Sequence, residues 1–183
     1  MAALGGLSLA VGVAVAETLR AQGASRVGLK WPNDLVAAGA KLGGVLVEIA
    51  RGADGGTVAV VGVGVNGSLG PRAAAIDQPW TDLATLLGTA PDRNRLAGAV
   101  LAALMDAMTS FDAQGLAPFR TRYAVLDSLA GRPVRVLDQH PFDGVARGVD
   151  DDGALLVDDG RARRRVMAGD VSVRAVAGNG VST

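Results

Sequence analysis

The N-terminal part of the chain begins with a long apolar run. Residues 1–19 are almost wholly apolar, and we predict a buried helix that Ser8 caps and that continues to about Gln22, with Gly23 as its stop signal. A signal peptide or membrane span is not expected here, because no lysine or arginine precedes Arg20 and the run is rich in alanine and glycine.

Short β-type segments follow this helix. Alternating and apolar patterns predict strands at 27–29, 35–37, 43–50 and 57–65, with turns at 38–39 and 52–56. Strands joined by such short turns must be antiparallel, because a parallel pair needs a crossover of a dozen residues or more. The pattern therefore argues against a Rossmann fold, despite the many glycines.

Helical periodicity returns after a loop at 67–80. We predict a short helix opening at Thr81-Asp82, a longer helix from Asp92 to about 113, and a further helical stretch at 116–129. Apolar residues fall near helical spacing in the longer helix, which predicts that these helices cover one face of the sheet; they are Leu96, Val100, Leu101, Leu104, Met105 and Met108.

Beyond Gly131 the texture changes to short strands separated by Asp and Gly turns. We predict strands at 134–137, 144–149, 154–157, 164–167 and 171–174, which suggest a small SH3-like β barrel. The Asp-Gly sequences at 150–153 and 158–160 are interpreted as hairpin turns rather than metal loops. The predicted fold is therefore α+β, with a mixed or antiparallel sheet backed by helices in residues 1–130 and a barrel in residues 131–183.

Composition narrows the functional classes. Eighteen basic residues balance eighteen acidic ones, so no overall field favours nucleic acid or an anionic membrane, and we expect neither as a partner. The chain has no cysteine and one histidine, His140, which excludes a cysteine nucleophile and a multi-histidine metal site within it. The absence of cysteine suits a reducing compartment, and we expect a cytoplasmic protein.

Three glycine- and charge-rich stretches look unlike core or turn sequence. Residues 30–34 read Lys-Trp-Pro-Asn-Asp, and residues 41–44 read Lys-Leu-Gly-Gly at the start of a predicted strand. Strand alternation places Gly62, Gly64 and Asn66 on one face, where the glycines leave space for a flat ligand.

The lysines add a further clue. Sixteen of the eighteen basic residues are arginine, and the two lysines are Lys30 and Lys41, both within these stretches. A compact ammonium that reaches a single oxyanion is a role that lysine fills better than arginine. Chance placement of two surface lysines is the alternative.

The ordered motifs resemble a known family. Lys-Trp-Pro-Asn-Asp at 30–34, Lys-x-x-Gly-x-Leu-x-Glu at 41–48 and Gly-x-Gly-x-Asn at 62–66 resemble three consecutive motifs of the biotin protein ligase catalytic domain. The resemblance continues through Trp80, the 119–123 segment and the barrel-like tail, so it covers essentially the whole chain.

The resemblance implies a fold related to class II aminoacyl-tRNA synthetases and an ATP- and Mg²⁺-dependent activation of biotin to biotinyl-AMP. Biotin would then pass to a lysine of a biotin carboxyl carrier domain. By motif, the catalytic residues would be Lys41 and Asp34, the biotin site Lys41, Gly44, Gly62 and Gly64, and the ATP site Lys30, Asn33, Asn66, Trp80 and Arg174. For Trp80, a half-buried core anchor is the alternative, and the metal ligands stay unassigned.

In that family a glycine- and arginine-rich loop and part of the biotin pocket precede the equivalent of the first helix, and this sequence does not contain them. Two interpretations therefore stay open: a ligase, or a non-catalytic remnant that binds biotin, nucleotide or the carrier domain. A lipoate ligase is disfavoured by the motif set. From this chain alone we expect weak binding of biotin and ATP, and self-association through an uncovered sheet edge.

Overall fold

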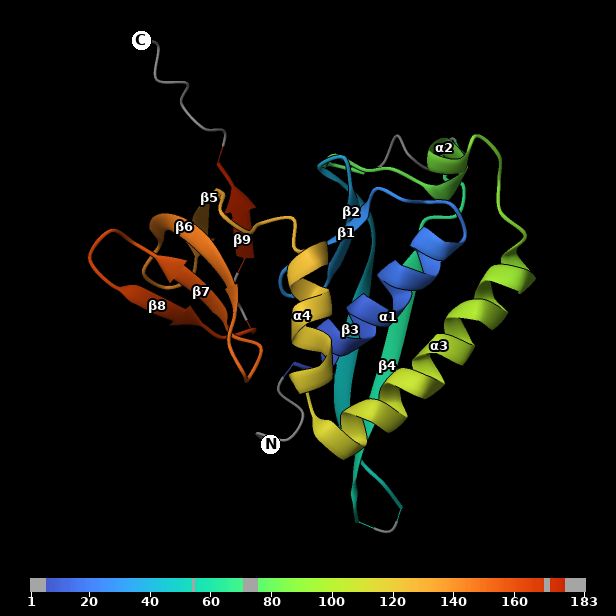
Figure 1. Cartoon of the computed structure of the whole chain (residues 1–183), viewed down its shortest axis with the longest axis horizontal. Helices are drawn as coiled ribbons and strands as arrows, with labels where there is room; N and C mark the ends of the chain where they lie inside the picture. The colour runs from blue at the N-terminus through green and yellow to red at the C-terminus, as the bar shows by residue number, and fades with distance from the viewer. Residues whose placement is uncertain (1–5, 54, 71–75, 170–171, 177–183) are drawn as a thin grey trace.

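The fold is built on two antiparallel sheets with helices packed on the first of them (Figure 1). The computed structural model describes residues 6–53, 55–70, 76–169 and 172–176. The elements of the first part are α1 (Leu7–Ala21), β1 (Val27–Lys30), β2 (Asp34–Ala37), β3 (Ala40–Arg51), β4 (Thr57–Val65), α2 (Leu83–Leu87), α3 (Arg93–Gln114) and α4 (Ala117–Leu126). The second part holds β5 (Pro133–Leu137), β6 (Phe142–Val149), β7 (Leu155–Asp158), β8 (Arg163–Val166) and β9 (Ser172–Ala175).

The first sheet has the strand order β1-β2-β3-β4, with every neighbouring pair antiparallel. The predicted turn between β2 and β3 is confirmed, since Ala38 and Gly39 both have positive φ, at 51° and 80°. Two positive φ angles are the requirement of the tight hairpin turns that match strand twist. β3 is longer than the predicted 43–50, and β4 occupies the predicted range.

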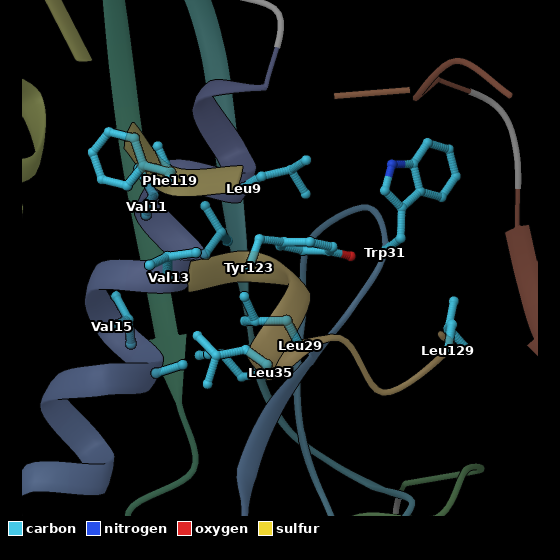
Figure 2. Close-up of a cluster of buried hydrophobic side chains, with 14 of the residues drawn as sticks. Leu9, Val11, Val13, Val15, Leu29, Trp31, Leu35, Phe119, Tyr123 and Leu129 are labelled. Carbon is cyan, nitrogen blue, oxygen red and sulfur yellow. The ribbon is translucent and has the colours of Figure 1, made fainter. Parts of the chain in front are cut away.

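Helix α1 is the centre of the first core. Ten of its residues are buried, among them Leu9, Val11 and Val13, because one side packs on the sheet and the other on α3 and α4 (Figures 1 and 2). The predicted cap was wrong: Gly6 holds the N-cap position, and Ser8 instead lies in the first turn, where its hydroxyl donates to the carbonyl of Pro32 at 3.4 Å.

Helix α3 begins after Asp92 as predicted, because that carboxylate accepts hydrogen bonds from the backbone N–H groups of Asn94 and Arg95. Its apolar face is less covered than predicted. Leu101 and Met105 are 61% and 65% exposed, because α3 packs along α1 at the flank of the layer rather than across the sheet. By length and composition alone α3 could cross a membrane, a test that helices of soluble proteins also pass.

The second sheet has the order β8-β7-β6-β5-β9 and is antiparallel throughout. Its strands agree with the five predicted segments to within two residues wherever they are described, although Val171 and residues 177–183 lie outside the described part. The Asp-Gly sequences form the β6–β7 and β7–β8 hairpin turns, as predicted. In the loop predicted at 67–80, residues 71–75 also lie outside the described part, as does Asp54 in the turn at 52–56.

Candidate functional site

The first sheet brings the three sequence motifs into one row. Strand pairing aligns Lys30 with Asp34, Asp34 with Gly44 and Gly44 with Gly64, so one residue from each of four strands stands side by side. Directly paired residues have their side chains on the same face of a sheet. The row therefore presents a cation, a carboxylate and two bare backbone positions to one side of the molecule.

Lys41 joins this row from the start of β3. Its ammonium nitrogen lies 2.5 Å from Asp34 Oδ1, and the nitrogen of Lys30 lies 3.9 Å from Asp34 Oδ2. A Cβ built on Gly44 would be 3.9 Å from the Lys41 Cε atom, so the lysine stem crosses the space in front of that glycine. The two lysines of the chain thus converge on one carboxylate, and both side chains keep about a third of their surface exposed.

The loop between β1 and β2 is anchored to β3 through Asn33. Its side-chain amide donates to the Val45 carbonyl at 2.9 Å, and the Val45 N–H donates to the Asn33 carbonyl at 2.8 Å. These two hydrogen bonds hold the loop in place beside Asp34, and one of them already uses the side-chain amide of Asn33. In the ligand-free chain Asn33 is therefore a scaffold residue for the neighbouring carboxylate.

Asn66 and Trp80 lie next to the backbone of Lys41. The Lys41 N–H donates to the Pro79 carbonyl and the Thr81 N–H donates to the Lys41 carbonyl, both at 2.9 Å, which forms a parallel bridge between Lys41 and Trp80. The Asn66 side-chain amide donates to the Thr81 carbonyl at 3.0 Å. Trp80 is partly buried, so the interpretation as a core anchor and the adenine-stacking role both stay open.

Asp82 stabilises this corner and has no place among the predicted site residues. Its buried carboxylate accepts hydrogen bonds from the N–H groups of Leu69 and Thr85 at 2.9 and 2.8 Å, which tie the segment after β4 to the start of α2. Burial acts to raise the pKa of Asp82, but these hydrogen bonds outweigh it and the net pKa lies below the usual range. The sequence predicted that Asp82 caps the helix that follows it, but it did not predict the hydrogen bond from the Leu69 N–H group.

The face that carries the row is open. Gly62 and Gly64 are exposed, as the alternation predicted, and a Cβ on Gly64 would meet nothing within 4 Å. Apolar side chains continue the same face along β3 and β4, and Leu46, Val58 and Val60 are each 44–57% exposed. A cleft of about 500 Å³ reaches Asn33 and a groove of about 730 Å³ reaches Asn66, but neither is lined by Lys41 or Asp34.

Arg174 belongs to the second sheet and not to the four-stranded sheet that carries this cluster. It is exposed on β9, where it pairs with Arg135 of β5. Among the described residues, no hydrogen bond or ion pair joins Arg174 to the residues of the row. The same part of the chain holds no group of three or more His, Cys, Asp or Glu side chains arranged to bind a metal ion.

Sequence reasoning also missed the role of Trp31. Its side chain is 1% exposed, and its indole N–H donates at 3.0 Å to the carbonyl of Gly153 in the β6–β7 turn. The peptide bond between Trp31 and Pro32 is cis. The sequence identified residues 30–34 as a candidate site because charged, aromatic and amide side chains occur together there. No local pattern indicated a hydrogen-bond partner for Trp31 that lies 122 residues away.

Comparison with known families places both parts of the chain. Residues 2–66 match the model of the Biotin/lipoate A/B protein ligase family, and residues 130–174 match that of the Biotin protein ligase C terminal domain. The bifunctional ligase/repressor BirA of Escherichia coli is 37% identical over 173 residues, covering 93% of this chain and 53% of the relative. A biotin–[acetyl-CoA-carboxylase] ligase of Mycobacterium tuberculosis is 37% identical over 175 residues, covering 92% and 62%.

Solved structures agree with this placement. The apo structure of biotin protein ligase from Aquifex aeolicus matches with a TM-score of 0.84 and 25% identity, over 94% of this chain and 76% of the other. The same enzyme in complex with biotin and ATP also has a TM-score of 0.84, at 24% identity, over 94% and 72%.

Fold and site thus define an α+β protein with antiparallel sheets, of the biotin/lipoate ligase type. Within that class, both parts of the chain are similar to biotin protein ligases. It spans 53% and 62% of the lengths of the two curated bacterial relatives named above.

Proposed function

We propose that this chain forms part of a biotin protein ligase that activates biotin with ATP and transfers it to a lysine of a biotin carboxyl carrier domain. The observation that carries the proposal is the row Lys30–Asp34–Gly44–Gly64 with Lys41 above it. It combines a cationic end with a flat surface at Gly44, Gly62 and Gly64 that carries no side chains and is called the floor below. Such a surface suits a ligand that has a carboxylate at one end and an apolar ring system at the other.

The chemistry requires charge stabilisation more than a nucleophile. A carboxylate must attack the α-phosphate, which brings two anions together and releases pyrophosphate. Lys41 would bind the biotin carboxylate and the phosphate, because its ammonium group is flexible, partly exposed and already beside the floor. Lys30 and Asn33 would lie on the nucleotide side, where Lys30 adds a second positive charge.

The floor and the adenine site follow from the same geometry. Gly44, Gly62 and Gly64 would line the biotin slot, and Leu46 would border it, since it pairs with Gly62. Asn66 would accept a hydrogen bond from adenine through its side-chain oxygen, because its side-chain N–H group already donates to the Thr81 carbonyl. Trp80 would pack on the adenine ring. Arg174 would reach the nucleotide from β9 of the second sheet.

Asp34 fits two further roles. Its carboxylate is an oxygen ligand of the kind that Mg²⁺ prefers, and Mg²⁺ bound with ATP commonly takes one or two carboxylates together with phosphate oxygens. Bound in that way, Mg²⁺ would neutralise phosphate charge. Asp34 would also accept the proton of the carrier lysine once Lys41 has turned towards the ligand.

We assign residues 1–130 to part of the catalytic domain and residues 131–183 to the C-terminal domain, in a cytoplasmic protein.

A second candidate function is a non-catalytic binding module. It is favoured by the open floor, which no described segment covers. Such a module would hold biotin, nucleotide or the carrier domain without forming an adenylate. A mixed anhydride formed on an uncovered floor would be exposed to water, so an open floor suits binding better than adenylate chemistry.

One assay separates the two. The chain is incubated with biotin, ATP and Mg²⁺, and pyrophosphate release is measured beside Lys41→Ala, with lipoate replacing biotin in a parallel series. Biotin-dependent release that Lys41→Ala abolishes supports the ligase. Saturable biotin binding without release supports the module. Release with lipoate but not biotin would contradict both.

A further inference from the structure

The 150–153 turn of the second sheet is pressed against the first part of the molecule. Gly153 has φ +84°, and a Cβ added there would lie 2.8 Å from Gly6 Cα and 3.2 Å from Leu9 Cδ1. Contact at that distance leaves no room for a side chain, so the turn touches the start of α1 through its backbone. The Gly153 carbonyl is thereby placed to accept the indole N–H of Trp31.

The turn is itself internally braced. Asp150 accepts hydrogen bonds from the N–H groups of Asp152 and Ala154, both at 3.0 Å, and the Gly153 N–H donates to the Asp150 carbonyl at 3.1 Å. Arg165 of β8 bonds to both Asp150 and Asp152. The acceptor for Trp31 is therefore a fixed group and not a mobile loop carbonyl.

Trp31 is three residues before the carboxylate that the two lysines share. Between them, the Pro32 carbonyl accepts the Ser8 hydroxyl and Asn33 pairs twice with Val45. A large ring that is 1% exposed cannot shift without disturbing its neighbours, because protein interiors are close-packed. The position of the indole therefore sets where the chain enters the Asn33–Asp34 segment.

We propose that Trp31 is a positioning residue: its hydrogen bond to Gly153 couples the β6–β7 turn of the second sheet to the Asn33–Asp34 segment and so aligns Asp34 with Lys41. The coupling is a statement about this chain without ligand; its effect on adenylation rests on the proposed function. A neighbouring link, the ion pair between Arg120 and Asp151, is 44% and 84% exposed at its two side chains and contributes little to alignment.

The test is amide hydrogen exchange on the ligand-free full chain, compared among wild type, Trp31→Phe and Arg120→Gln. Trp31→Phe keeps an aromatic ring in the core but removes the donor, and Arg120→Gln removes only the exposed ion pair on the same turn. We expect exchange at Asn33, Asp34 and Ala154 to accelerate at least tenfold in Trp31→Phe, and to stay within about twofold of wild type in Arg120→Gln. Unchanged exchange at Asn33 and Asp34 in a folded Trp31→Phe would overturn the proposal.

A second variant acts from the other side of the contact and keeps the test valid if Trp31→Phe does not fold. Asp150→Ala removes the side-chain hydrogen bonds that brace the turn, and it changes no residue of the first sheet. Faster exchange at Asn33 and Asp34 can then arise only through the turn. No change there would also overturn the coupling.

Adenylation is measured separately: for Trp31→Phe we expect a tenfold fall in kcat, with the KM for biotin little changed. A wild-type chain without adenylation counts against the proposed function alone, since the exchange result still decides the coupling.

Discussion

The ammonium group of Lys41 lies 2.5 Å from Asp34 Oδ1, across the hairpin that joins β2 and β3. The register between these strands shifts at an irregularity between Leu35 and Val36, so that Asp34 pairs with Gly44 while Lys41 pairs with Val36. A partly exposed ion pair of this kind is worth about 1 kcal/mol or less. A phosphate or carboxylate ligand can therefore compete with Asp34 for Lys41 at small cost.

Lys41→Ala should abolish biotin-dependent adenylation with little change in stability. One preorganised cation directed at developing phosphate charge contributes about 3 kcal/mol, which corresponds to a fall of about 100-fold or more in kcat/KM. Lys41→Arg is the matched control for charge, and we expect it to be nearly as inactive, because the guanidinium is bulkier and the stem passes 3.9 Å from the position of a Gly44 Cβ. Pyrophosphate release and urea unfolding measure the two quantities. Near-normal activity in Lys41→Ala would remove Lys41 from the mechanism.

Gly64→Ala and Gly43→Ala should separate ligand binding from folding. An added Cβ on Gly64 meets nothing within 4 Å, so the fold should keep its stability to within about 0.5 kcal/mol while the new methyl group occupies the floor. An added Cβ on Gly43 would stand 2.2 Å from the Gly64 carbonyl oxygen, so β3 and β4 would have to separate. Overpacking of this severity costs about 3 kcal/mol or more.

The measurement for this pair is biotin titration by calorimetry beside thermal unfolding. We expect weaker biotin binding with an unchanged Tm for Gly64→Ala, and a large fall in Tm for Gly43→Ala. Unchanged biotin affinity in Gly64→Ala would show that the ligand does not lie on this floor.

Strand β4 was predictable to the residue because its nine residues form an almost wholly apolar run bounded by turn residues. The row across four strands was not, because it depends on the shift at Leu35–Val36, which leaves no mark in the sequence. The apolar face of α3 was visible as periodicity, but a pattern does not say whether a neighbour covers that face. Motif resemblance supplied the candidate residues, whereas only the coordinates placed Lys41, Asp34 and Gly44 together.

Tyr123→Phe should leave stability unchanged or raise it by about 1 kcal/mol. The Tyr123 ring is 1% exposed, and its hydroxyl, directed towards Trp31 in Figure 2, has no hydrogen-bond partner among the described protein groups. Burial raises its pKa well above the usual value, and the nearby carboxylate of Asp127 raises it further. Removal of an unpaired buried hydroxyl recovers its desolvation cost. Tyr123→Ala is the packing control and should lose about 3 to 5 kcal/mol; a loss above 1 kcal/mol in Tyr123→Phe would reveal a hydrogen bond to the hydroxyl.

Asp127→Asn should remove part of the pH dependence of stability. Burial raises the pKa of Asp127, and the N–H groups of Leu129 and Ala130 lower it by less, so the folded chain favours the protonated carboxyl. One oxygen accepts the Leu129 N–H at 2.8 Å, while the other has no partner among the described residues. Because the folded pKa is raised, this group stabilises the fold fully below its unfolded pKa of about 3.9 and loses that contribution as pH rises through the folded pKa.

Asparagine keeps the acceptor for Leu129 without carrying a charge. The unfolding free energy of Asp127→Asn minus that of wild type should therefore increase from about pH 4 upwards and become constant once Asp127 is ionised in the folded wild type. Urea titrations at several pH values between about 4 and 7.5 measure this difference, in which the other titrating groups cancel. Asp112→Asn, at an exposed position of α3, is the control for the substitution of aspartate by asparagine itself. A flat difference for Asp127→Asn would mean that water reaches the unpaired oxygen and that its burial does not disfavour the charge.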